Sequence, residues 1–113
     1  PVRNEAVLLK TCLESISNLN HPADKIEVII ADGMSIDNTA EVAKKFGAKV
    51  VLNEKITVSP GRNIAFKNAS GEIIAFTDAD CVVDKNWIKN SLKYFKDKKV
   101  ACAGGPNLTP PDE

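Results

Sequence analysis

Short apolar runs alternate along this chain with stretches that have the periodicity of a helix. The clearest runs are "IEVIIA" (26–31), "AKVVL" (48–52) and "EIIAFT" (72–77), and "VACAGG" (100–105) is a fourth. Near-continuous apolar runs of this length are typical of parallel strands that are covered on both faces. Their alternation with helices indicates an α/β fold, with a mainly parallel sheet flanked by helices.

Helices are expected over residues 5–19, 37–46 and 62–69, and after Asp84. The first is expected to be capped by Asn4, and the second by Ser35 or Asp37 before it ends at Gly47. Helical spacing predicts that the first helix buries Leu8, Cys12, Ile16 and Leu19. It predicts that the last helix buries Trp87, Ile88, Leu92 and Phe95. Residues 106–113 are predicted to be a turn-rich end.

Composition narrows the class of protein. The 113 residues fit one domain, and 15 basic residues balance 15 acidic ones. This balance gives no bulk attraction to nucleic acid, and no apolar run approaches the roughly 20 residues that span a bilayer. With three cysteines, one histidine and no CxxC pair, a zinc site is not expected. Reduced thiols and a cytoplasmic location are the expectation.

Two aspartates, Asp78 and Asp80, follow the apolar run 72–77 one residue apart. Alternate residues of an extended chain point to the same side, so the two carboxylates could aim at one point. A hard divalent cation such as Mg²⁺ or Mn²⁺ would offset their repulsion and attract a diphosphate. The alternative is a solvated turn in which one aspartate caps the helix that follows.

Other polar residues stand where strands end or helices begin, and ligands of open α/β sheets bind beyond the carboxyl ends of the strands. Asp32 could accept a hydrogen bond from a ribose or a base, or form only an Asx-turn. Gly61 and Arg62 are expected at a helix start that favours an anion, although Arg62 could instead pair with a neighbouring acid. Glu5 could reach a ligand or only oppose the helix dipole.

Several well-known catalytic patterns are missing from the sequence. Neither a Ser/His/Asp nor a Cys/His arrangement is apparent. The glycine patterns GxGxxG and GxxxxGK[ST] are also absent, which argues against a dinucleotide cofactor and phosphate-loop nucleotide hydrolysis.

Taken in order, "PVRNE", "ADGMSIDNT" and "SPGRNIAFKNASGEIIAFTDAD" resemble the family 2 glycosyltransferases, which have the Rossmann-like GT-A fold. The resemblance covers nearly the whole chain, but only the nucleotide-sugar-binding half of the family's catalytic domain. It therefore implies a truncated GT-A fold in which residues 1–113 are incomplete at both ends.

The resemblance implies a role for each matching residue toward a UDP-sugar donor. Glu5 and Asp32 would hold the ribose and the uracil, and Pro1 and Arg3 would line the base. Arg62 would lie near the nucleotide or its phosphates.

"Asp78-Ala79-Asp80" matches the family's DxD motif. By resemblance, Asp80 is the direct ligand of Mn²⁺ or Mg²⁺, and Asp78 lies nearer the ribose while also serving the metal. The whole enzyme would transfer the sugar with inversion to the hydroxyl of an unknown glycan or lipid acceptor, without nucleic acid.

Two departures from the family limit what this chain can do alone. The family has an apolar strand before "PVRNE", and its general base lies after the position that corresponds to Glu113. We therefore expect the chain to bind donor nucleotide without turnover. The parent protein could associate with the cytoplasmic face of a membrane.

Two other readings stay open at this point. The first is a phosphohydrolase of the haloacid dehalogenase type, with Asp78 as nucleophile, although that family usually has the motif after its first strand. The second is a non-catalytic module that binds nucleotide or a partner.

Overall fold

Two parallel strands form the sheet, with one further backbone bridge. The computed structural model describes residues 1–109. Strand β1 (Ile29–Asp32) pairs in parallel with β2 (Lys49–Leu52), so that Asp32 lies opposite Leu52. On its other side β1 meets Val2, which forms a parallel bridge with Asp32. The start of the chain and β2 therefore flank β1, and the expected α/β class with a parallel sheet is confirmed.

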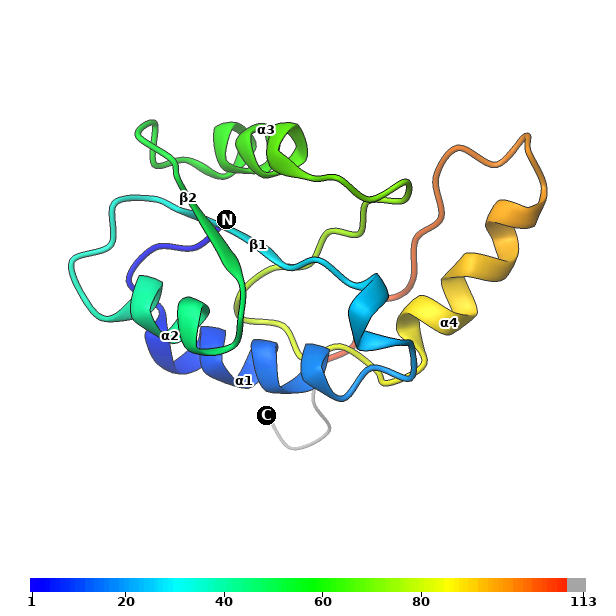
Figure 1. Ribbon diagram of the computed structural model, residues 1–113, viewed down its shortest axis with the longest axis horizontal. Helices are drawn as coiled ribbons and strands as arrows, with labels where there is room; N and C mark the ends of the chain where they lie inside the picture. Colours follow the sequence, from blue (N-terminus) through cyan, green and yellow to red (C-terminus); the bar gives the residue numbers. More distant parts are fainter. Residues whose placement is uncertain (110–113) are drawn as a thin grey trace.

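Helices cover both faces of this sheet. Helices α1 (Ala6–Ser17) and α2 (Thr39–Lys45) lie on one face, and α3 (Val58–Asn68) lies on the other (Figure 1). The chain continues to α4 (Trp87–Leu92), and short 3₁₀ turns are present at Ala23–Lys25 and Lys93–Lys96. Gly47 follows α2 with a φ of 78°, as expected for a glycine that ends a helix.

The core lies between α1, α2 and the sheet. Its buried members are small or aliphatic: Val2, Leu9, Leu13, Ala43, Ala48 and Ala79. On α1 the buried residues are Leu9, Cys12 and Leu13, whereas Leu8 is 48% exposed. The predicted stripe is therefore confirmed at Cys12 and, in part, at Ile16, but it was wrong at Leu8, because Leu9 and Leu13 are the leucines that face the core. Both stripes have helical spacing, and packing against α2 and the sheet selects one of them.

Asn4 does not cap α1, contrary to the prediction. Its backbone N–H donates to Ser35 Oγ at 2.9 Å, and its side-chain Oδ1 accepts from the Ile36 N–H at 2.8 Å. The Glu5 N–H donates to Thr39 Oγ1 at 3.1 Å. These bonds join the start of α1 to the loop after β1, so distant partners have replaced the local cap.

The two later predicted strands are not strands in the part of the chain that the structure describes. Residues 72–77 and 100–105 have no strand assignment, and Ile73 and Phe76 are 42% and 51% exposed. A strand requires hydrogen bonds to a neighbouring backbone, and no backbone within residues 1–109 supplies such a partner for them. Apolar composition alone therefore predicted these strands wrongly.

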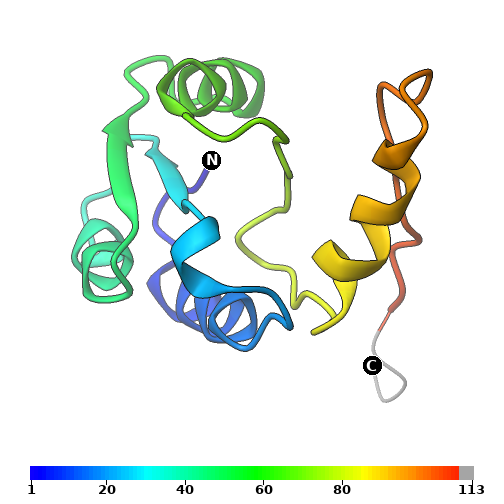
Figure 2. The same cartoon turned by 45° about the vertical axis from the view of Figure 1, so that its right-hand side comes forward.

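Helix α4 stands apart from the layered core (Figure 2). Its predicted apolar stripe is only partly buried, because within residues 1–109 α4 has few contacts with any helix or strand other than the 3₁₀ turn that continues it. Asp84 accepts the Asn86 N–H at 2.7 Å just before the helix. Within residues 1–109 no helix combines the length and the apolar character needed to cross a membrane. The predicted turn-rich end lies partly outside the described residues.

Candidate functional site

A pocket of about 220 Å³ lies beside the backbone bridge at the carboxyl end of β1. Five of the seven predicted site residues line it, Pro1, Glu5, Arg62, Asp78 and Asp80, together with Val58 and Ala79. A larger cavity, of about 460 Å³, lies between the second half of α1 and residues 26–28 and 46–49, and none of the predicted site residues lines it. We therefore take the smaller pocket as the candidate site.

Arg62 and Asp78 form an ion pair across this pocket. The guanidinium Nη2 lies 3.1 Å from Asp78 Oδ1, and both side chains are about half exposed. Such an exposed pair adds little stability, but it places a cation beside the two carboxylates. The prediction that Arg62 lies at a helix start was wrong. Helix α3 already begins at Val58, and the Gly61 N–H donates to the Thr57 carbonyl. Any anion contact at this position therefore depends on the guanidinium.

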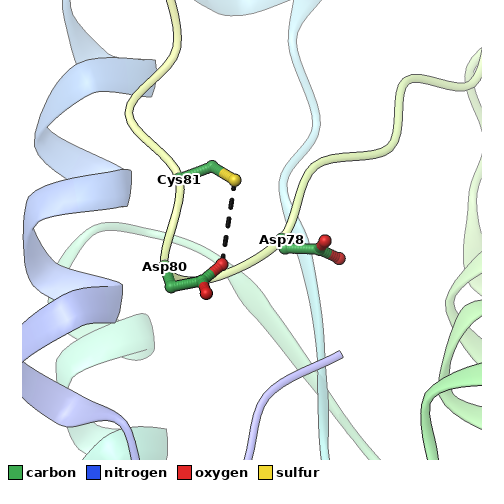
Figure 3. A group of neighbouring side chains, drawn as sticks. All are labelled: Asp78, Asp80 and Cys81. Atoms are coloured by element: carbon green, nitrogen blue, oxygen red, sulfur yellow. Dashed lines mark hydrogen bonds between the residues drawn. The ribbon is translucent and has the colours of Figure 1, made fainter. Parts of the chain in front are cut away.

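Asp78, Asp80 and Cys81 form a group of potential metal ligands (Figure 3). One carboxylate oxygen of each aspartate and the Cys81 sulfur all lie within 4.8 Å of one another. The Cys81 thiol donates to Asp80 Oδ1 at 3.7 Å. Both aspartates are exposed and Cys81 is partly buried. Two hard oxygens and one soft sulfur are a donor set that fits a divalent cation.

The backbone turn that presents these ligands is anchored to α1. Ala79 is buried in the core, and the Cys12 thiol donates to the Asp78 carbonyl oxygen at 3.6 Å. Burial raises the pKa of Cys12 to about 11, and the nearby Cys81, Asp80 and Asp78 contribute in the same direction. Cys12 therefore stays a protonated donor at neutral pH, and its hydrogen bond ties the turn to α1.

Asp32 and Arg3 lie outside the lining of the pocket. Asp32 is buried, and its Oδ1 accepts from both the N–H and the hydroxyl of Ser35. These bonds close a local turn to the third residue on, whereas the Asx-turn that was the alternative reading would use the second. Asp37 likewise accepts from the Thr39 N–H at the start of α2. Arg3 is exposed beside the bridge. A nucleotide contact for either Asp32 or Arg3 stays a prediction.

Gly61 lets α3 pack closely against the first residue of the chain. A Cβ added at Gly61 would lie 2.6 Å from Pro1 Cβ and 2.9 Å from Asn53 Nδ2. Asn53 is fully buried, and its Nδ2 also donates to the Thr57 carbonyl at 2.9 Å. The absence of a side chain at Gly61 therefore sets the position of α3, and of Arg62, relative to Pro1.

Gly61→Ala should lower the free energy of unfolding by about 1–2 kcal/mol, although alanine has the higher helix propensity. The added methyl would overlap the Pro1 ring and the buried Asn53 amide, so α3 must shift. Chemical denaturation measures this change. Gly104→Ala is the matched control, because a Cβ there meets nothing within 4 Å. Equal stability of the two variants would contradict the packing described for Gly61.

Sequence reasoning missed three residues of the site. Val58 and Ala79 line the pocket, and Cys81 joins the two aspartates. Val58 and Ala79 had no chemical signal in the sequence. Cys81 had one, because a thiol directly after Asp-Ala-Asp is a third potential ligand next to the first two.

Comparison with known proteins decides the family. Residues 1–111 match the model of glycosyl transferase family 2. The chain belongs to glycosyl transferase family 2. Glycosyltransferase AglE from Haloferax volcanii is 30% identical over 111 residues, which are 93% of this chain but 36% of that relative. The chain therefore spans about a third of the length of that relative.

Solved structures agree with this family and with its GT-A fold. TarS 1–349 from Staphylococcus aureus, in complex with UDP, superposes with a TM-score of 0.77 and 26% identity, over 95% of this chain and 36% of that one. The mannosyltransferase PcManGT from Pyrobaculum calidifontis, in complex with GDP-Man and Mn²⁺, superposes with a TM-score of 0.78 and 29% identity. The match covers 88% of this chain and 32% of that one.

Proposed function

We propose that this chain is the donor-binding part of a metal-dependent glycosyltransferase that uses a UDP-sugar. The observation that supports this most is the pocket in which Arg62, Asp78 and Asp80 meet beside the carboxyl end of β1. A guanidinium and two carboxylates that line one pocket can hold a diphosphate together with a divalent cation. Membership of the family and the nucleotides bound by TarS and PcManGT add support.

Asp80 is the proposed direct ligand of Mn²⁺ or Mg²⁺, and Asp78 is a second ligand on the side of the ribose. When bound, the cation would neutralise charge that develops on the departing diphosphate. Arg62 already lies against Asp78, so it is within reach of the same phosphates. The turn that carries the aspartates is held by Cys12 and Ala79, which fixes the backbone from which the two carboxylates extend.

The remaining nucleotide contacts are proposed for residues around the same pocket. Pro1 and Arg3 would line the base, and Glu5 and Asp32 would hold the ribose and the uracil. Pro1 and Glu5 line the pocket itself. Asp32 is linked to it through the Ser35–Asn4 hydrogen bonds, which fix the loop after β1 against the start of α1.

We assign no general base to these 113 residues. Inverting transfer requires a base that deprotonates the acceptor hydroxyl while the diphosphate leaves. Within the described residues, the acids of the pocket are Glu5, Asp78 and Asp80, and all three are proposed for donor or metal binding. We therefore propose that the chain alone binds donor nucleotide and does not turn it over, and that the parent enzyme acts on a glycan or lipid hydroxyl. The three free thiols fit a cytoplasmic setting.

Calorimetric titration with UDP, GDP and ADP tests this proposal, with Mn²⁺ present and then with a chelator. We expect UDP to bind most tightly and its binding to require the cation. Binding that is unchanged by the chelator would contradict the role of the metal. Failure of a demonstrably folded chain to bind any of the three nucleotides would contradict the donor-binding function.

Sugar transfer is measured in the same preparation with a UDP-sugar and candidate acceptors. Transfer by the isolated chain would contradict the assignment of the base to another part of the protein. Of the two alternative readings, the phosphohydrolase loses its support once the family is known. A non-catalytic module would bind UDP equally well, and only the parent protein's transfer activity separates it from the enzyme.

A further inference from the structure

Cys81 stands beside the two aspartates, although a site for Mg²⁺ needs only oxygen ligands. Its sulfur lies 3.7 Å from Asp80 Oδ1 (Figure 3). A tetrahedral ion with metal–sulfur and metal–oxygen bonds of about 2.3 and 2.0 Å would hold those two atoms roughly 3.5 Å apart. The separation that their hydrogen bond gives these two atoms is therefore one that two ligands of a single ion can also have.

The other two thiols are placed differently. Cys12 is buried and donates to the Asp78 carbonyl, so it supports the turn and does not face an incoming ion. Cys102 is exposed and does not belong to the ligand group. The Cys81 sulfur lies within 4.8 Å of a carboxylate oxygen of each aspartate, and the Cys81 side chain is partly exposed to solvent.

We propose that Cys81 is a third ligand at the Asp78–Asp80 metal site and makes that site prefer thiophilic cations, such as Cd²⁺ and Zn²⁺, to Mg²⁺. This inference rests on the proposed function, which places a metal at the two aspartates. Thiolate sulfur selects soft cations, whereas carboxylate oxygens bind hard ones. An oxygen-only site would favour Mg²⁺ or Mn²⁺, and a site with one sulfur would bind Mn²⁺ through its carboxylates while holding Cd²⁺ more tightly.

Titration with Cd²⁺, followed by the ultraviolet sulfur-to-cadmium charge-transfer absorption, tests the ligand directly. The reference chain has Cys102→Ser, which removes an exposed thiol that would bind Cd²⁺ by itself. Adding Cys81→Ser should abolish the absorption and weaken Cd²⁺ binding by at least about tenfold, the lower end of what even an outer-shell partner contributes. Mg²⁺ binding, measured by calorimetry, should change much less. An absorption or a Cd²⁺ affinity that survives Cys81→Ser would overturn the proposal.

Alkylation gives a second measurement that needs no substitution at Cys81. In the reference chain, Cd²⁺ should protect Cys81 from iodoacetamide, as read by peptide mass spectrometry, and the same concentration of Mg²⁺ should not. Equal modification of Cys81 with and without Cd²⁺ would overturn the proposal even if the serine variant did not fold.

The same samples separate this inference from the proposed function. Mn²⁺-dependent UDP binding without a cadmium signal would leave the donor site standing and remove Cys81 from it. A cadmium signal that requires Cys81, in a chain that binds no UDP, would support the third ligand and contradict the donor-binding function.

Discussion

Asp80→Asn is expected to weaken Mn²⁺-dependent UDP binding by about 100-fold, or roughly 2.7 kcal/mol. The substitution keeps the shape of the side chain but removes the charge of the proposed direct ligand. It also removes repulsion between two carboxylates whose oxygens lie within 4.8 Å. Stability without metal should therefore not fall. Calorimetry with and without Mn²⁺ measures the first effect, and thermal unfolding of the metal-free chain measures the second.

Asp24→Asn is the matched control for this variant. Asp24 is an exposed aspartate in the 3₁₀ turn Ala23–Lys25, outside the pocket, and its loss changes the net charge by the same amount. UDP binding by Asp24→Asn should equal that of the unmodified chain. Equal weakening in both variants would show that net charge, and not a ligand at position 80, governs binding.

Leu9→Ala is expected to lower the free energy of unfolding by about 2–5 kcal/mol. Leu9 is 1% exposed and belongs to the buried cluster that also contains Val2 and Ala79. Truncation leaves a cavity between α1 and the two segments that border the pocket. The free energy of unfolding of a small domain is only roughly 5–15 kcal/mol. Part of the Leu9→Ala chain should therefore be unfolded, and its nucleotide binding should fall accordingly.

Val7→Ala gives the comparison on the same helix. Val7 is 80% exposed, and its truncation should change stability by less than about 0.5 kcal/mol. Urea denaturation of both variants measures the difference. Similar losses for Leu9 and Val7 would contradict the observed orientation of α1.

Local patterns were sufficient for much of the fold. The run 48–52 predicted β2 closely, and the run 26–31 predicted β1 but began three residues too early, because the central strand of a parallel sheet requires a continuous apolar segment. Gly47 ended α2 as expected, because few other residues adopt its positive φ without strain. The same kind of reasoning failed at residues 72–77, because pairing with a neighbouring backbone is not encoded in the composition of one segment.

The candidate site likewise contains residues that local sequence predicted and contacts that it did not predict. Asp78 and Asp80 were recognisable because their spacing and their place after an apolar run are local. The Arg62–Asp78 ion pair and the Asn4–Ser35 contact were not, since each side chain had several possible partners in the sequence. Arg62 had been left open between a phosphate and a neighbouring acid, and the structure places it against the acid.

By itself the sequence determined the α/β class, the order of its first elements and the pair of carboxylates beyond an apolar segment, because periodicity and spacing act over a few residues. Only the tertiary structure decided that α1 buries Leu9 and not Leu8, and that Cys12 meets the Asp78 carbonyl across 66 positions of the chain. The same packing holds against α1 the turn that carries Asp78, Asp80 and Cys81, which are already neighbours in the sequence. Contacts of this kind depend on how helices and strands pack together, which no local pattern specifies.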